Sequence, residues 1–206
     1  MTNFYNWLNE ATELYYHGTS KEKNGLGILK LGYIKPPLLP KKKNFLTPVD
    51  GKVYLSKSLE YSVIYTIGAN MIGSDLPESI IKSDGQFGYL FVIKNLINSI
   101  QPDEDNIGEL IYKNIIPWLT IFAKNNLTDR QYKKVMDGEY SYWAKAGKKL
   151  IPKFSKKQMK EMIDISPNIA YDGIIKFDQA WKFDKKRNNE LDKNASNFFK
   201  IADRIK

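Results

Sequence analysis

Gly88-Tyr-Leu-Phe-Val-Ile-Lys94 is a short, continuous run of aromatic, aliphatic and β-branched residues. Such a run predicts a strand that is buried on both faces. Towards the N-terminus, Leu14-Tyr-Tyr-His-Gly-Thr-Ser20 and Val53-Tyr-Leu-Ser56 also have strand character, and each ends in polar residues. Towards the C-terminus, residues 169–177 return to the same character. The chain therefore contains at least four predicted strands.

Helical patterns separate these strands. We expect helices over residues 22–30 and from Ser58, a plausible N-cap, to about residue 69. The pattern stays helical over residues 107–149, with a restart at Thr128-Asp129, and Ser155-Lys-Lys-Gln158 is a capping box before a further helix. Short strands in this order favour an α+β fold with a bent or split β-sheet, flanking helices and a helical insertion at about 107–165.

Composition bounds the classes of function. A chain of 206 residues with 42% hydrophobic and 27% charged residues predicts one folded domain over residues 1–206. It has no cysteine and one histidine, which excludes disulfide scaffolds, cysteine nucleophiles and histidine-cluster metal sites, so we expect no metal. The longest apolar stretch, residues 115–123, is too short for a membrane span, and the first residues do not resemble a signal peptide. We expect a cytoplasmic protein.

The charge is concentrated in the C-terminal third. Lysine and arginine number 32 against 23 acidic residues, and residues 148–206 alone hold 15 basic and 8 acidic ones. A basic segment of this kind is typical of DNA- or RNA-binding proteins. The same composition is also typical of the solvated surface of a lysine-rich chain.

The only histidine, His17, stands near the end of a predicted strand and precedes Gly18 and Thr19. A histidine in this place exposes its ring and the neighbouring backbone groups, and a glycine lets a ligand approach the backbone closely. The alternative interpretation is a histidine that is hydrogen-bonded at a turn.

Three further residues stand at a distinctive spacing from one another. Tyr54 and Tyr65 are eleven residues apart, and Ser62 precedes Tyr65 by three. Together with the His-Gly-Thr segment at His17, this spacing resembles the NAD-binding half of the ADP-ribosyltransferase superfamily, in its poly(ADP-ribose) polymerase branch. The resemblance is most specific over residues 14–70.

The resemblance implies an ADP-ribosyltransferase-like split sheet and NAD as co-substrate. It implies that His17 hydrogen-bonds ribose hydroxyls, and that the Gly18 backbone and the Ser62 side chain bind the nicotinamide carboxamide. Tyr65 would stack on the nicotinamide ring and Tyr54 would close its other side, since a flat, cationic ring is bound well by aromatic faces. The residues expected to contact NAD are His17, Gly18, Thr19, Tyr54, Ser62 and Tyr65.

One motif of the family is missing. The family commonly has a glutamate at the start of a late strand, and the counterpart here, residues 168–172, begins with asparagine. We expect Asp172 or Glu109 to supply the catalytic carboxylate beside His17 and Tyr54. Asp164 and Glu161 also lie near residues 168–172 in the sequence. A missing glutamate favours mono-ADP-ribosylation of a nucleic acid or protein over chain elongation. The resemblance further implies a bacterial toxin, a phage protein or a defence protein.

Two alternatives remain. RNA 2′-phosphotransferases also use NAD and have a similar His-Gly-Thr opening and a Val-His-Leu-Ser strand, close to Val53-Tyr-Leu-Ser56. They depend on a second histidine and paired arginines, whereas this chain has Tyr54 in that strand and three arginines in all. The other alternative is a non-catalytic module that binds a nucleotide or docks on a partner. The sequence does not indicate an oligomeric state.

Overall fold

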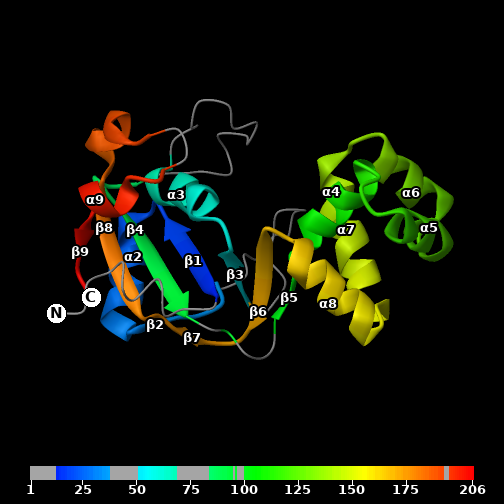
Figure 1. Cartoon of the computed structure of the whole chain (residues 1–206), viewed down its shortest axis with the longest axis horizontal. Coiled ribbons are helices and arrows are strands. Elements are labelled where there is room, and N and C mark those ends of the chain that lie inside the picture. The colour runs from blue at the N-terminus through cyan, green and yellow to red at the C-terminus, as the bar shows by residue number, and fades with distance from the viewer. Residues whose placement is uncertain (1–12, 38–50, 69–83, 95, 97–99, 193–194) are drawn as a thin grey trace. The chain divides into compact units, whose positions relative to one another are not determined.

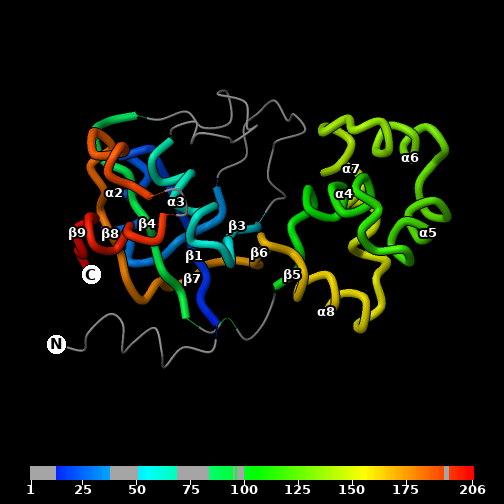
Figure 2. The backbone as a smooth tube through the Cα atoms, turned by 45° about the horizontal axis from the view of Figure 1, so that its top comes forward, coloured from blue at the N-terminus to red at the C-terminus, as the bar shows by residue number. Residues whose placement is uncertain are grey.

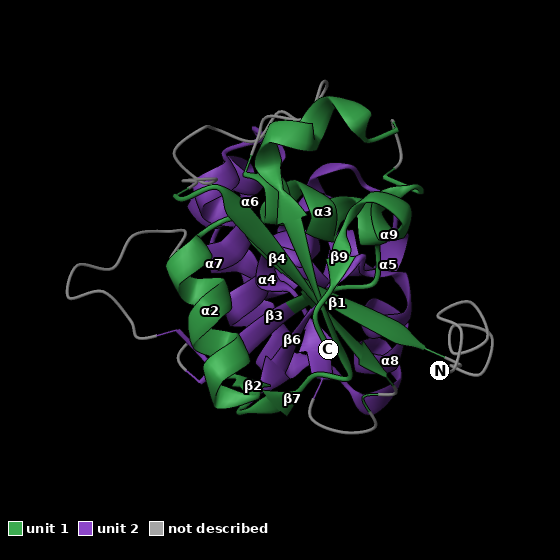
Figure 3. Cartoon of the chain, turned by 90° about the vertical axis from the view of Figure 1, so that its left-hand side faces the viewer, with its two compact units in different colours: residues 1–35, 55–98, 173–206 green, residues 36–54, 99–172 purple. Residues whose placement is uncertain are grey.

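The computed structural model is α+β, with a mostly antiparallel sheet and flanking helices (Figure 1). It describes residues 13–37, 51–68, 84–94, 96, 100–192 and 195–206. The chain divides into two compact units (Figure 3). Unit 1 comprises residues 1–35, 55–98 and 173–206, and unit 2 comprises residues 36–54 and 99–172. The single domain expected over residues 1–206 and its insertion stay predictions.

Unit 1 is built on antiparallel strands. Strand β1 (Leu14–Thr19) pairs along its whole length with β4 (Phe87–Lys94), and its other neighbour is the end of β3 (Lys52–Ser56). On the far side of β4 lie β8 (Gln179–Asp184) and then β9 (Asp203–Arg204). A separate pair joins β2 (Tyr33–Ile34) to β7 (Ile175–Lys176).

Both faces of β4 are covered, as its apolar run predicts. Leu90 and Val92 pack with Val63 and Ile67 of α3 (Leu59–Ile67) on one face. Residues one position away point to the opposite face, where α2 (Glu22–Leu31) approaches the ring of Tyr89. The remaining elements of unit 1 are η2 (Lys185–Glu190) and α9 (Phe198–Ile201), which adds Phe198 to the first cluster.

Unit 2 is a helical cluster attached to short strands. Strand β5 (Ile100–Pro102) pairs antiparallel with β6 (Asn168–Asp172), and β3 is the next strand after β6. Figure 2 shows the chain passing from β5 into the helices and returning from the last helix into β6. The helical elements are α4 (Glu104–Tyr112), α5 (Pro117–Asn126), α6 (Asp129–Met136), α7 (Tyr140–Leu150), η1 (Ile151–Lys153) and α8 (Lys156–Ile165).

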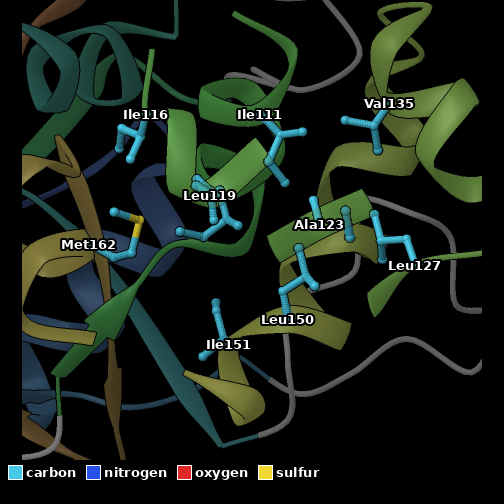
Figure 4. Close-up of a cluster of buried hydrophobic side chains, with 11 residues drawn as sticks. Ile111, Ile116, Leu119, Ala123, Leu127, Val135, Leu150, Ile151 and Met162 are labelled. Atoms are coloured by element: carbon cyan, nitrogen blue, oxygen red, sulfur yellow. The ribbon is translucent and has the colours of Figure 1, made fainter. Parts of the chain in front are cut away.

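The helices of unit 2 enclose their own apolar core (Figure 4). Its members come from five helices and from the turns that join them, and several are completely buried. The core residues labelled in Figure 4 are Ile111, Ile116, Leu119, Ala123, Leu127, Val135, Leu150, Ile151 and Met162.

None of the helices in the described part of the chain has the length and apolarity that a membrane span requires.

Several local predictions are confirmed. Ser58 caps α3 by accepting a hydrogen bond from the Tyr61 backbone N–H, and Ser155 with Gln158 forms a capping box at α8. Thr128 likewise caps α6, where the sequence predicted a helix restart. The sequence also predicts a short amphipathic helix over residues 3–13 and loops over 41–50 and 68–85, and these segments lie mostly outside the described residues.

Two local predictions are wrong. The helical stretch over 107–149 is divided among α4 to α7 rather than between two helices. The run Gln101-Pro-Asp-Glu-Asp-Asn106, with its proline and three acidic residues, predicts an acidic turn. It contains instead the end of β5 and the start of α4, because Asp103 caps that helix with its carboxylate.

Candidate functional site

The His17 side chain lies beside Phe91 in unit 1. His17 and Phe91 are directly opposite each other in the β1–β4 pair, so their side chains share a face of the sheet. Their ring centroids are 6.4 Å apart, with a tilt of 37° between the rings. The neighbouring residue, Gly18, faces the other side of the sheet, towards α3.

Helix α3 packs closely on β1 at Gly18. A Cβ atom built on Gly18 would lie 2.0 Å from the Ser62 carbonyl oxygen and 2.8 Å from Thr66 Oγ1. The Thr66 hydroxyl in turn donates to the Ser62 carbonyl over 2.9 Å. The space that a side chain at residue 18 would fill is therefore taken by α3, and a ligand could reach only the backbone groups of Gly18.

One edge of β1 is paired differently from the other. With β4, the register runs from Leu14 to Thr19, whereas with β3 the described register consists of Tyr16 opposite Ser56. Within unit 1, Gly18 therefore lies two residues beyond the described pairing of β1 with β3, on the edge of β1 that faces β3. Backbone N–H and C=O groups at such an edge can bind the amide of a ligand in the plane of the sheet.

Helix α3 presents two of the predicted residues in different environments. Ser62 is buried, with 2% of its surface exposed, and packs at Gly18. Tyr65 follows it by three residues, on the same side of the helix, and is 37% exposed. The structure therefore brings the His-Gly-Thr and the Ser-x-x-Tyr segments together within unit 1.

Tyr54 belongs to unit 2, where it meets a carboxylate that the sequence analysis missed. Its hydroxyl donates to Glu104 Oε2 over 2.9 Å, and Gln101 Nε2 donates to Glu104 Oε1 over 3.3 Å. Glu104 is 3% exposed. Along β3, Tyr54 precedes by two residues Ser56, the partner of Tyr16. Its place directly after a helix N-cap, Asp103, could have pointed to Glu104 in the sequence. The acidic residues on both sides made it look like part of a solvated acidic turn.

The residues on either side of Glu104 carry perturbed carboxyl groups. Burial, followed by the nearby charges of Asp105 and Glu104, raises the pKa of Asp103 to about 7. Burial and the charge of Glu104 raise the pKa of Asp105 to about 6, although a hydrogen bond from Tyr140 and the charge of Lys148 oppose the shift. Three adjacent carboxyl groups thus repel one another at the start of α4.

The two carboxylates expected to be catalytic both pair with lysines in unit 2. Asp172 lies 2.5 Å from the Lys52 ammonium, and Glu109 lies 2.5 Å from Lys113 one helical turn away. At the start of β6, where the family glutamate would stand, the backbone N–H of Asn168 donates to Asn106 Oδ1. Neither expected carboxylate is seen with a predicted NAD-binding residue among the described contacts, and their catalytic role stays a prediction.

Part of the basic C-terminal segment stabilises unit 1. The Lys185 ammonium donates to the carbonyl oxygens of Ser20 and Asp84. The Arg187 guanidinium donates to both carboxylate oxygens of Glu190 and to the Ile201 carbonyl. These two cations therefore hold backbone segments together, in addition to any role towards a polyanion.

Among the described residues, no group of three or more histidines, aspartates and glutamates could hold a metal ion. Comparison of the chain with models of protein families, with curated proteins and with solved structures found no match.

Proposed function

We propose that the chain is an NAD-dependent mono-ADP-ribosyltransferase that releases nicotinamide and modifies a macromolecular acceptor. The observation that supports this proposal is the close approach of Gly18 to Ser62, which joins the two segments of the resemblance in one unit. Neither the segments' sequence separation nor their composition requires them to meet.

The chemistry available at this place suits a carboxamide. A nicotinamide carboxamide has one acceptor and one donor group, and the Gly18 backbone offers one N–H and one C=O. The Ser62 hydroxyl adds a donor or acceptor from α3. Tyr65, exposed one turn later, offers an aromatic face for the cationic ring.

The reaction proposed is a transfer at the anomeric carbon of the nicotinamide ribose. The bond to the nicotinamide nitrogen breaks, and nicotinamide leaves with the bonding electron pair. A nucleophilic oxygen or nitrogen of the acceptor forms the new bond and loses its proton. In the transition state the anomeric carbon has oxocarbenium character. Positioning and electrostatic stabilisation therefore supply most of the rate enhancement.

The proposal is tested by nicotinamide release from NAD, with and without cell lysate. We expect the wild-type chain to release nicotinamide and His17→Ala to be at least tenfold slower with its fold intact, since the proposal gives the ring the contacts that position the ribose. Labelled NAD, followed by nuclease and protease treatment, identifies nucleic acid or protein as the acceptor. Absence of NAD binding and of release would contradict the proposal, and removal of a 2′-phosphate from RNA would favour the phosphotransferase.

A second prediction concerns Tyr65. If its ring stacks on nicotinamide, Tyr65→Phe keeps binding near the wild-type level, while Tyr65→Ala weakens nicotinamide binding by about 1–2 kcal/mol. Titration calorimetry measures both. Tyr61, 43% exposed on the same helix, provides the control, because Tyr61→Ala removes a similar surface ring without the expected contact. Equal losses for Phe and Ala at position 65 would instead assign the binding to the hydroxyl.

A further inference from the structure

In unit 2, the Tyr54 hydroxyl is hydrogen-bonded to the buried carboxylate of Glu104. Glu104 is 3% exposed, and burying a carboxylate is costly unless hydrogen bonds compensate it. Two side-chain groups do so, the Tyr54 hydroxyl at 2.9 Å and the Gln101 amide at 3.3 Å. A hydrogen bond to a charged acceptor is about twice as strong as one between neutral groups.

The position of Glu104 is also fixed from the backbone side. It is the first residue of α4, directly after Asp103, whose carboxylate caps the helix. Helix α7 packs against it at Gly147, where an added Cβ would lie 2.1 Å from the Glu104 carbonyl oxygen. The carboxylate therefore extends from a point of the backbone that two helices hold in place.

We infer that Glu104 is a positioning residue for Tyr54, an inference that rests on the proposed function. The carboxylate takes the only proton of the Tyr54 hydroxyl, so the ring is held in one orientation and its oxygen can offer a ligand only acceptor capacity. Asp172 and Glu109 do not compete for this role among the described contacts, because each pairs with a lysine.

The experiment compares two replacements of Glu104 by their kcat and KM for nicotinamide release. Glu104→Leu removes the acceptor and should lower kcat/KM about tenfold, mainly through kcat, since a loosened ring misplaces the reacting groups. Glu104→Gln keeps an acceptor oxygen for the Tyr54 hydroxyl and should therefore retain activity within about threefold of wild type. The double variant Tyr54→Phe, Glu104→Leu should be no slower than Glu104→Leu alone, because the two substitutions remove the same hydrogen bond.

A matched control is available in the same unit. Glu161 accepts a hydrogen bond from the Trp118 indole over 2.9 Å, the same length as the Tyr54 bond. Trp118→Phe therefore removes an aromatic–carboxylate bond elsewhere without changing a carboxylate, and it should reduce thermal stability while leaving kcat unchanged. This separates a positioning role from a general loss of stability.

The outcomes are distinguishable. A wild-type chain that releases no nicotinamide would overturn the proposed function, and the role of Glu104 with it. An active wild type with Glu104→Leu as fast as Trp118→Phe would overturn the role of Glu104 alone. If Glu104→Leu does not fold, Tyr54→Phe removes the same bond and keeps the ring; wild-type kcat in that variant would overturn the inference.

Discussion

Gly18→Ala is expected to lower the free energy of unfolding of unit 1 by about 3 kcal/mol, at the upper end of the cost of overpacking. The added Cβ would lie 2.0 Å from the Ser62 carbonyl oxygen, a backbone atom that no side-chain rotation can move. The helix must therefore shift away from β1, taking Ser62 and Tyr65 with it. Hydrogen exchange of the β1 and β4 amides measures the stability, and nicotinamide release should fall to near background.

Gly27 provides the control for this substitution. It lies within α2, where an added Cβ would meet nothing within 4 Å. Gly27→Ala should therefore stabilise unit 1 by about 0.5–1 kcal/mol through the higher helix propensity of alanine. Equal stabilities of the two variants would contradict the close packing of α3 on Gly18, whatever the function of the chain.

The sequence predicted those features of unit 1 that depend on local physical chemistry. The run from Gly88 to Lys94 is a strand buried on both faces because its apolar residues do not alternate with polar ones. The helix ends at Ser58 and Ser155 were predictable because each side chain caps the backbone within three residues of itself. Strand β8 was missed, because its polar first and last residues, Gln179 and Asp184, concealed a buried interior.

The candidate site could be predicted only in part, because most of its contacts join residues that are distant in the sequence. The spacing of Ser62 and Tyr65 follows from one helix turn, but their meeting with Gly18 depends on how α3 packs. The bond from Tyr54 to Glu104 spans fifty residues. No periodicity distinguishes a fully buried glutamate in an acidic run from the less deeply buried aspartates beside it.

The sequence also could not show which cations of the basic C-terminal segment already bind groups within the fold. Net charge reports on solubility and association, and it does not reveal which cations are already engaged. Lys185 and Arg187 bind backbone carbonyl groups of unit 1, whereas Lys186 between them is exposed. A test of nucleic-acid binding by charge reversal should therefore spare Lys185 and Arg187, because their loss would also weaken the fold.

The second large effect is expected from Asp103→Asn, as a change in how stability depends on pH. Burial raises the pKa of Asp103 to about 7, so between its ordinary value of 3.8 and about 7 the folded chain binds more protons than the unfolded one. The contribution of Asp103 to the free energy of unfolding therefore falls as the pH rises through this window. Asparagine keeps the cap on α4 but cannot ionise. At about pH 8 the variant should therefore be more stable than wild type by about 4 kcal/mol, and at about pH 4 nearly equal to it.

Urea unfolding followed by far-UV circular dichroism, which reports chiefly on the helices of unit 2, measures this difference at both pH values. Asp129 is the matched control, since it is an exposed aspartate in the first turn of α6. Asp129→Asn makes the same substitution on an exposed side chain and shows what the change of side chain does by itself. Asp105→Asn should act in the same direction as Asp103→Asn, over the lower window that ends at its pKa of about 6. An Asp103→Asn variant that is no more stable than wild type at about pH 8 would contradict the crowded, buried start of α4 on which the positioning of Glu104 depends.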